Sequence, residues 1–248
     1  MSVYRIAELN IDIQPRSDYV RKQLSDFAVN EETADFDIAL TKEDILNEQK
    51  IYCQNNTDIK LTDFSVDLCE SLALYRKICR KITMDYNGIL MHGAVICYKG
   101  KAHMFTAPSG TGKTTHIRLW KKYFGDKVEI INGDKPILRE KDGIITAYGT
   151  PWNGKENYGS NISAPLKSIF LLKRGKINTV KKCDTRQAIP YLLSQTLRYK
   201  DEKSVKNLLD FIAKIIQTVN IYELECNMEL SAVETSLSVI DEIIPEEH

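Results

Sequence analysis

The chain has 248 residues, enough for one large α/β domain or for a core domain with a smaller appendage. Its 34 Lys and Arg residues balance its 34 Asp and Glu residues, so no net charge favours nucleic acid or an anionic membrane as partner. No apolar run reaches the roughly 18 residues of a membrane span, and the N-terminus lacks the pattern of a secretory signal. We expect a cytoplasmic globular protein that binds neither nucleic acid nor membrane.

The cysteines are spread along the chain without a Cys-x-x-Cys pair and without a histidine at metal-ligand spacing. They are Cys53, Cys69, Cys79, Cys97, Cys183 and Cys226. Buried, reduced cysteine is common in protein cores, so we expect these residues to pack and not to bind metal.

Residues 1–66 predict a small β-rich region. Alternating apolar side chains predict strands over residues 3–9, 10–13 and 36–40 and a further strand around Ile59 and Leu61. Between the second and third strands, apolar residues recur at helical spacing from Tyr19 to Ala28, after a possible cap at Ser17 or Asp18.

Residues 67–248 predict a larger α/β domain. It opens with a helix over residues 68–86, followed by β-prone runs at 89–98 and 101–106 that Lys99-Gly100 separates as a hairpin turn. A glycine-rich loop comes next. The remaining elements are a helix at 114–124, strands at 128–131, 136–139, 143–148 and 167–172, helices at 188–199 and 202–218, a strand at 219–225 and a helix at 230–243.

The glycine-rich loop, Ala-Pro-Ser-Gly-Thr-Gly-Lys-Thr-Thr over residues 107–115, approximates the phosphate-binding pattern G-x-x-x-x-G-K-[ST], with alanine at the first position. Its glycines would let successive amides point at an anion near the start of the next helix. Lys113 would reach the β- and γ-phosphates, and the Thr114 hydroxyl would bind Mg²⁺. The expected nucleotide ligands are Ser109, Gly110, Thr111, Gly112, Lys113, Thr114 and Thr115.

A strand before this loop and a helix after it form the setting that a phosphate loop needs. The alternative is a glycine-rich helix start without a ligand, but it does not account for Lys113 and Thr114 together.

Two more residues are candidates for catalysis, together with Lys113. Asp134 follows the apolar run 128–131 and would hold the metal with Thr114, although an aspartate in a turn is the simpler alternative. His92 lies on the hairpin that leads into the loop and could act near the γ-phosphate, or it could be a structural strand residue. We expect His103 and His116 to be structural or surface residues.

A turn-rich segment over residues 149–159 combines glycines with aromatic and charged side chains, which is typical of a substrate-binding loop. Trp152, Lys155 and Glu156 are the candidate substrate contacts; the alternative is a surface loop whose aromatics pack on the domain. The pair Lys173-Arg174 could add charge near the phosphates, but a solvated strand end is the favoured interpretation.

The loop residues 109–115, the preceding hairpin with His92-Gly93 and the strand that ends at Asp134 resemble the HPr kinase/phosphorylase and phosphoenolpyruvate carboxykinase group. The resemblance covers about residues 88–138. It implies an α/β P-loop kinase core, here with the small β-rich N-terminal region, and ATP-dependent phosphorylation of a hydroxyl, often a serine. The group has two adjacent aspartates where this chain has Gly133-Asp134.

We therefore expect a P-loop kinase that uses ATP and Mg²⁺ and acts on a serine of a protein or peptide, or on a small hydroxylated molecule. One alternative is a sensor that binds ATP without transferring phosphate, which Gly133 favours. Another is a carboxykinase-like enzyme acting on an oxo-acid. The sequence leaves the acceptor, the preferred phosphoryl donor, any phosphorolytic reverse reaction and the oligomeric state open.

Overall fold

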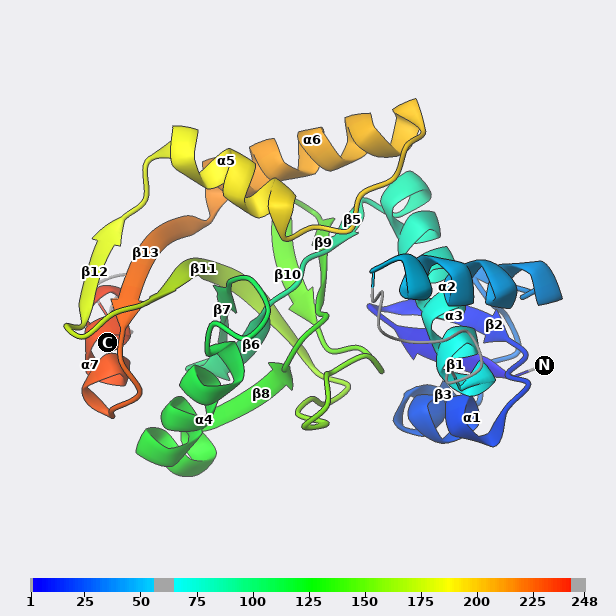
Figure 1. Ribbon diagram of the computed structural model, residues 1–248, viewed down its shortest axis with the longest axis horizontal. Helices are drawn as coiled ribbons and strands as arrows, with labels where there is room; N and C mark the ends of the chain where they lie inside the picture. The colour runs from blue at the N-terminus through cyan, green and yellow to red at the C-terminus, as the bar shows by residue number, and fades with distance from the viewer. Residues whose placement is uncertain (1, 56–64, 242–248) are drawn as a thin grey trace. The chain divides into compact units, whose positions relative to one another are not determined.

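The computed structural model describes residues 2–55 and 65–241 and shows a mixed α/β fold (Figure 1). The chain divides into two compact units, Met1–Ile82 and Thr83–His248. The division falls near the end of helix α3 (Val66–Asp85), whereas the sequence analysis places a boundary between residues 66 and 67, at the start of this helix.

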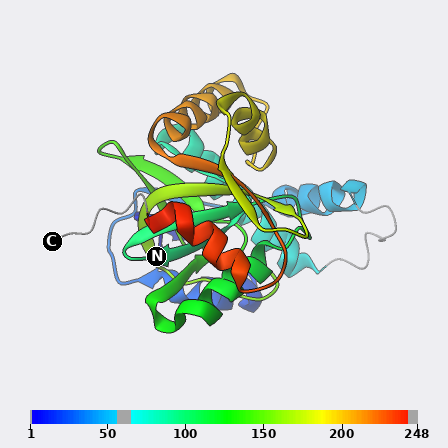
Figure 2. The same cartoon turned by 90° about the vertical axis from the view of Figure 1, so that its left-hand side faces the viewer.

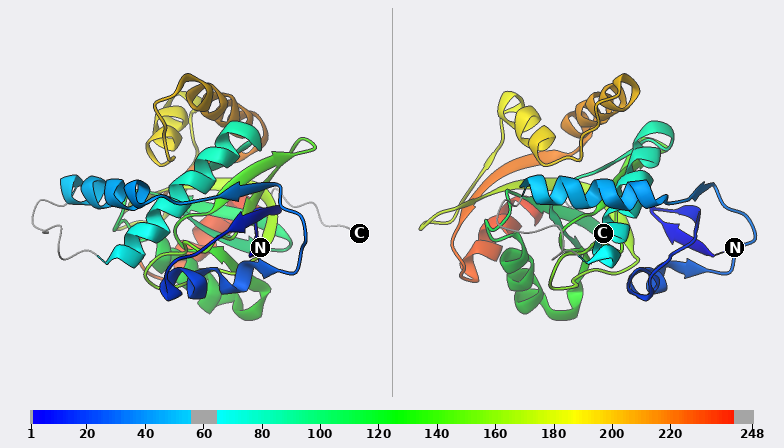
Figure 3. Two further views of the ribbon diagram at one scale, coloured as in Figure 1. Left: turned by 90° about the vertical axis from the view of Figure 1, so that its right-hand side faces the viewer. Right: turned by 45° about the vertical axis from the view of Figure 1, so that its right-hand side comes forward.

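The first unit contains a four-stranded sheet of order β3-β1-β2-β4, shown in two views in Figure 3. Its strands are β1 (Val3–Ile6), β2 (Leu9–Ile13), β3 (Ala28–Val29) and β4 (Phe36–Ile38). Strands β1 and β2 form a hairpin whose turn residues, Ala7 and Glu8, both have positive φ angles. The predicted break after residue 9 was therefore wrong, because the turn lies at residues 7 and 8. The strand predicted around residues 59–61 lies outside the described residues.

The helices of this unit are α1 (Asp18–Leu24), α2 (Lys42–Asn55) and α3. Sequence periodicity missed α2, which has few apolar residues. A capping box marks its start, because Asp44 Oδ2 accepts the Thr41 N–H at 2.7 Å and Thr41 Oγ1 accepts the Asp44 N–H at 3.1 Å. This reciprocal pair was the sequence signal available for the helix.

A buried carboxylate joins helices α1 and α3. Glu70, 3% exposed on α3, accepts the backbone N–H groups of Arg16 at 2.7 Å and Ser17 at 3.0 Å. Ser17 in turn caps α1, since its side-chain oxygen accepts the Val20 N–H at 3.3 Å. One side chain of α3 therefore fixes where α1 begins.

Replacing Glu70 with alanine is expected to lower the free energy of unfolding by about 1–3 kcal/mol, because two backbone N–H groups lose their acceptor. Urea unfolding followed by circular dichroism measures the loss. The matched control is Glu32→Ala at an exposed position, which is expected to change stability by less than about 0.5 kcal/mol. Equal stability of the two variants would contradict the role given to Glu70.

The second unit contains a nine-stranded sheet. Its main path has the order β5-β9-β10-β11-β7-β6-β8, and β13 pairs with β11 and with β12. The strands are β5 (Gly88–Leu90), β6 (Ala94–Tyr98), β7 (Lys101–Thr106), β8 (Val128–Asn132), β9 (Ile137–Lys141), β10 (Ile144–Tyr148), β11 (Ser163–Arg174), β12 (Thr179–Lys182) and β13 (Asn220–Cys226). Strands β7, β11 and β13 are parallel neighbours.

Two strand predictions in this unit need correction. The run predicted over residues 89–98 is two strands, because β5 pairs with β9 whereas β6 pairs with β7 and β8. Strand β12 was not predicted: it pairs antiparallel with β13 and has exposed lysines, so its apolar alternation is weak. The Lys99-Gly100 hairpin turn is confirmed, with positive φ at both residues.

Helices cover both faces of this sheet. Helices α4 (Lys113–Phe124) and α7 (Ser231–Asp241) lie on one face, and α5 (Thr185–Ser194) and α6 (Glu202–Thr218) lie on the other (Figure 2). Successive side chains of β7 point to opposite faces of the sheet and enter two hydrophobic clusters. Phe105 belongs to the cluster that contains Trp120 of α4, and Met104 belongs to the cluster that contains Phe211 of α6.

Helix α5 starts and ends earlier than the predicted helix over residues 188–199. Asp184 caps it by accepting the Arg186 N–H at 2.8 Å, so Pro190 lies inside the helix and not in its first turn. Within residues 2–55 and 65–241, no helix combines the length and apolar character that crossing a membrane requires.

Candidate functional site

The sheet order brings three separate segments together. Strand β6 lies between β7 and β8 and is antiparallel to both. Its beginning therefore lies at the same end of the sheet as the ends of β7 and β8. The Gly93 N–H donates to the Asp134 carbonyl at 2.9 Å, which joins the segment before β6 to the turn after β8. His92, the glycine-rich loop and Asp134 consequently meet at one edge.

The loop between β7 and α4 needs glycine at two positions. Gly110 and Gly112 have φ angles of 77° and 122°, which side chains rarely adopt. Gly112 also precedes α4, and its carbonyl accepts the His116 N–H at 2.9 Å. The loop thus ends at a helix N-terminus, whose first amides and helix dipole favour an anion.

Lys113 lies across this loop. Its Nζ donates to the Ala107 carbonyl at 2.8 Å and to the Pro108 carbonyl at 3.3 Å, and the residue is only 6% exposed. Burial lowers the pKa of Lys113, and the nearby Asp134 carboxylate opposes that effect while the Lys135 ammonium adds to it. An anion in the loop would provide this ammonium group with a charged partner in place of neutral carbonyls.

Arg174, at the end of β11, holds the outer side of the loop. Its guanidinium donates to the carbonyl oxygens of Gly110 and Thr111, the latter from Nε at 3.2 Å. A trans peptide points its C=O and N–H in opposite directions, so the Gly112 N–H faces away from Arg174. Sequence analysis favoured a solvated strand end here, because no local pattern reveals a partner more than 60 residues away.

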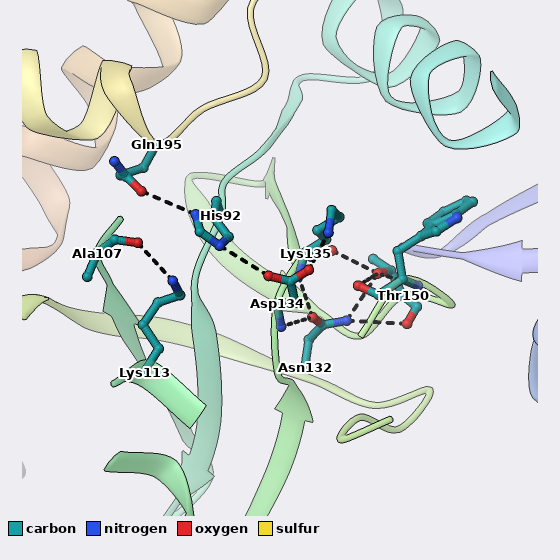
Figure 4. A network of polar contacts seen from close by, with 9 residues as sticks. His92, Ala107, Lys113, Asn132, Asp134, Lys135, Thr150 and Gln195 are labelled. Atoms are coloured by element: carbon teal, nitrogen blue, oxygen red, sulfur yellow. Dashed lines mark hydrogen bonds and ion pairs between the residues drawn. The ribbon is translucent and has the colours of Figure 1, made fainter. Parts of the chain in front are cut away.

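Asp134 is the centre of a polar network (Figure 4). Its Oδ1 lies 3.1 Å from His92 Nε2, and its Oδ2 pairs with the Lys135 ammonium group. Burial alone would raise the pKa of Asp134, but the hydrogen bond from His92 and the Lys135 charge lower it to about 2. The carboxylate is therefore anionic at neutral pH.

Residues that the sequence analysis missed position this network. The buried Asn132 Oδ1 accepts the N–H groups of Asp134 at 2.8 Å and Lys135 at 2.7 Å. Its Nδ2 donates to Thr150 Oγ1 at 3.0 Å. Asparagine before glycine is a turn signal, and it was available in the sequence at Asn132-Gly133.

Gln195, just after α5, holds His92 from the other side. The His92 N–H donates to the Gln195 carbonyl at 2.7 Å, and His92 Nδ1 lies 3.3 Å from Gln195 Oε1 (Figure 4). The imidazole is thus fixed between an amide and the Asp134 carboxylate, with Nε2 donating to the carboxylate. Sequence analysis had no reason to select Gln195, because the contact joins residues 103 positions apart.

A cavity of about 420 Å³ opens between the loop and this network. The predicted site residues that line it are His92, Ser109, Gly110, Gly112, Lys113, Thr114, Thr115, Asp134, Lys155 and Glu156. Two predicted residues do not line it. Thr111 faces a second cavity, and Trp152 is 5% exposed in the interior of the protein.

Gly133 explains why this turn carries one carboxylate. A Cβ atom there would lie 2.9 Å from the Asn153 carbonyl oxygen and 3.0 Å from that of Tyr158. The Gly133 N–H also donates to the Tyr158 carbonyl at 2.7 Å. The turn-rich segment therefore packs too closely on Gly133 for any side chain, and a second aspartate does not fit at this position.

The oxygen donors fit a weakly held Mg²⁺ ion. Within the described part of the chain, no group of three or more His, Cys, Asp or Glu residues could hold a metal ion. The Thr114 hydroxyl and the Asp134 carboxylate line the same cavity, and Mg²⁺ commonly takes one or two such ligands together with phosphate oxygens and water. The residues thus suit an ion that arrives with a phosphate ligand.

A second cavity of about 380 Å³ lies on the other side of the loop. It shares Gly110, Gly112 and Thr115 with the first cavity. Its other lining residues are Thr111, His116, Leu119, Leu172, Lys173, Arg174, Gly175, Cys226, Asn227 and Met228.

Comparisons with known proteins give distant structural similarity and no sequence match. No protein-family model matches the chain, and no curated protein sequence matches it. The solved structure of the Hpr(Ser) kinase/phosphatase from Coxiella burnetii is similar with a TM-score of 0.36 and 9% sequence identity, over 62% of this chain and 95% of that chain. A TM-score this low does not carry a function from one protein to the other.

Asp134 is expected to make stability depend on pH. Its pKa of about 2 in the folded protein lies below the ordinary 3.8, so the carboxylate contributes about 2 kcal/mol above pH 4. This contribution is lost as the pH falls from about 4 to about 2, because the unfolded chain binds the proton first.

Metal-free wild-type protein and Asp134→Asn, compared by urea unfolding between pH 7 and pH 2, should differ most at neutral pH and converge in acid. Asp142→Asn, in the turn between β9 and β10, is the control. The difference in its free energy of unfolding from wild type should be the same at neutral and at acidic pH. A stability difference for Asp134→Asn that stays constant over this pH range would contradict the assignment.

If the loop binds MgATP, as the sequence analysis expects, Arg174→Ala should weaken that binding about tenfold, because the loop loses two charge-assisted hydrogen bonds that orient its peptides. Calorimetry measures the affinity. Arg174→Lys should restore only part of it, since an ammonium group cannot bridge two carbonyls in the same way. Arg118→Ala on the exposed side of α4 removes the same charge and should leave the affinity unchanged. Unchanged affinity in Arg174→Ala would refute the positioning role.

Proposed function

We propose that the chain is an ATP-dependent kinase that transfers a phosphoryl group to a hydroxyl of a protein, peptide or small molecule. The observation that carries this proposal is the cavity itself: a glycine-rich loop, a buried lysine, a threonine hydroxyl and an anionic aspartate all line it. The resemblance of residues 109–115, the His92-Gly93 hairpin and the strand that ends at Asp134 to the HPr kinase group supports the same function. The proposal assigns catalysis to residues 67–248 and treats residues 1–66 as a small β-rich accessory region.

Phosphate binding would use the chain's fixed donors. Lys113 and the first residues of α4 line one cavity, and Arg174 keeps the loop peptides oriented. The loop peptides are oriented before a ligand arrives, whereas Lys113 would exchange the Ala107 and Pro108 carbonyls for phosphate oxygens. Positioning and charge neutralisation account for most of the catalysis expected of a phosphoryl-transfer enzyme.

Thr114 and Asp134 would hold Mg²⁺, which neutralises charge on the phosphates when bound. Asp134 has a second use, because a carboxylate oxygen can accept a hydrogen bond from an incoming hydroxyl and aim its oxygen at the γ-phosphorus. With a pKa of about 2 it is a weak base, so it orients the hydroxyl and takes the proton late in the transfer. His92 keeps the carboxylate in place.

Transfer would replace one oxygen–phosphorus bond with another. The acceptor oxygen forms a bond to the γ-phosphorus, and the bond from that phosphorus to the β,γ-bridging oxygen breaks. ADP leaves with the electron pair, and the hydroxyl proton passes to Asp134 and then to solvent. Lys155 and Glu156, exposed on the rim of the cavity, would contact the acceptor, while Trp152 supports their loop from inside.

A specific observation favours a second candidate, an ATP-binding sensor that transfers nothing. Both carboxylate oxygens of Asp134 already have cationic or hydrogen-bonding partners, and Gly133 leaves no room for a second carboxylate. A carboxykinase-like activity has no comparable support, because no arginine is among the described residues that line this cavity.

Lys113→Ala is the primary test. It should weaken MgATP binding and reduce ATP consumption at least 100-fold, because the ammonium group faces the phosphates in the ground state and the transition state. Lys122→Ala, an exposed lysine on the same helix, is the matched control and should behave like wild type.

ATP consumption by the wild type is measured with and without serine-containing peptides and small polyols. Turnover that depends on a hydroxyl acceptor supports the kinase. Tight ATP binding without turnover on any acceptor would favour the sensor, and undiminished turnover in Lys113→Ala would overturn the assignment of the loop.

A further inference from the structure

One carboxylate lies among two lysine side chains at the centre of the site. The turn after β8 reads Gly133-Asp134-Lys135, and Gly133 leaves no room for a second acidic side chain. The Asp134 carboxylate pairs with the Lys135 ammonium group. The negative charge of Asp134 raises the pKa of Lys113, whereas the positive charge of Lys135 lowers it. Both ammonium groups are therefore within electrostatic range of the same carboxylate, so two positive charges face one negative charge.

The fold sets the direction of the Lys135 side chain. The Lys135 N–H donates to Asn132 Oδ1 at 2.7 Å, and its carbonyl accepts the Thr150 hydroxyl at 2.8 Å. The main chain is thus held on both sides, and the side chain, 31% exposed, extends to Asp134 Oδ2 (Figure 4). Solvent screens a partly buried pair less than a pair on the open surface. Lys135 is not among the described residues that line the cavity, so its ammonium group reaches the carboxylate from outside the cavity.

This pairing reduces the attraction of Asp134 for a metal ion. An ionised carboxylate has about four lone-pair sites, so His92 and Lys135 leave lone pairs for a metal ion. What Lys135 removes is net charge, because its ammonium group neutralises the carboxylate. A divalent cation that arrives alone is attracted by Asp134 and repelled by Lys113 and Lys135. The net attraction of the site for the free ion is therefore small.

A metal ion bound to a nucleotide meets different electrostatics. The triphosphate chain keeps a net negative charge with Mg²⁺ bound, so Lys113 and Lys135 attract the complex although they repel the free ion. When the ion reaches Asp134 together with phosphate oxygens, Lys135 exchanges its carboxylate partner for an anionic ligand. The same ammonium group thus opposes binding of the metal alone and favours binding of the metal with its nucleotide.

We propose that Lys135 is a specificity-determining residue that competes with the metal ion for Asp134, so that the site accepts Mg²⁺ only as a complex with the nucleotide. This inference rests on the proposed function of the phosphate loop and adds an order of binding that the loop alone does not set. In the exchange, the ion pair between Lys135 and Asp134 breaks, while a metal–carboxylate contact and an ammonium–phosphate contact form.

The experiment uses Mn²⁺ alone as the probe, because it takes the same oxygen ligands as Mg²⁺ and its electron paramagnetic resonance signal measures the free ion. Titration of the full chain without nucleotide gives the affinity. Lys135→Met removes the charge from a side chain of similar length and should bind Mn²⁺ at least about tenfold more tightly than wild type. Lys127→Met, at an exposed position after α4, is the matched control and should bind Mn²⁺ like wild type.

Two further variants identify the cause of this gain. Lys135→Arg keeps the positive charge and should hold the Mn²⁺ affinity within about threefold of wild type. Combining Lys135→Met with Asp134→Asn should abolish the gain, because the carboxylate that binds the ion is then missing. An equal gain in Lys135→Arg, or a gain that persists with Asp134→Asn, would overturn the inference. Lys135→Gln gives the same comparison should Lys135→Met not fold.

Calorimetry with MnATP separates this inference from the proposed function. Wild type and Lys135→Met should bind MnATP within about threefold of each other, because the variant gains affinity at the metal and loses it at the phosphates. Unchanged affinity for Mn²⁺ alone in folded Lys135→Met, with MnATP bound as in wild type, would overturn the inference and leave the proposed function standing. Failure of wild-type protein to bind MnATP would refute the phosphate loop, and with it both proposals.

Discussion

The antiparallel position of β6 between β7 and β8 is the constraint on which the site depends. It places the beginning of one strand beside the ends of two others, so His92, the glycine-rich loop and Asp134 are brought to a single edge. Backbone hydrogen bonds fix this arrangement before any side chain contributes. The Gly93 N–H on the Asp134 carbonyl extends the sheet pairing into the site itself. The geometry of the polar groups is thus a property of the sheet.

Within that frame, the charged groups of the site have hydrogen-bonding partners in the protein itself. Lys113 bonds loop carbonyls, Arg174 bonds the outer peptides, and Asp134 is divided between His92 and Lys135. Such a site is ordered in advance, but each group has to exchange a protein partner for a ligand. Phosphate oxygens can replace the neutral carbonyls of Lys113 favourably, because charge-assisted hydrogen bonds are stronger. The Lys135 ammonium group is a charged partner of Asp134, so a ligand displaces it less easily than it displaces the neutral carbonyl partners of Lys113. This pairing is the structural reason for considering a sensor as well as a kinase.

Close packing of the segment over residues 149–159 shapes the other side of the cavity. It leaves Gly133 no space for a side chain and buries Trp152, while Lys155 and Glu156 remain at the rim. Specificity for an acceptor would therefore come from charged side chains on a loop, and the interior aromatic would hold that loop in place.

The sequence by itself determined the local elements that have strong local signals. The loop pattern at residues 107–115, the helix after it, the Lys99-Gly100 turn and the α/β character all follow from spacing, glycine chemistry and hydropathy that act within a few residues. Helix α2 shows the limit of prediction from periodicity. The Thr41 and Asp44 pair indicated where the helix starts, but the weak apolar periodicity of its residues gave no helix signal.

Only the tertiary structure decided which residues meet. Asn132, Gln195 and Arg174 act through partners on other elements, and the opposite placement of Trp152 and Lys155 results from packing. The splitting of residues 89–98 into β5 and β6 likewise depends on which strands pair with each half. Strand pairing and close packing depend on the whole chain at once, whereas capping, turn formation and helical periodicity depend on neighbours in sequence.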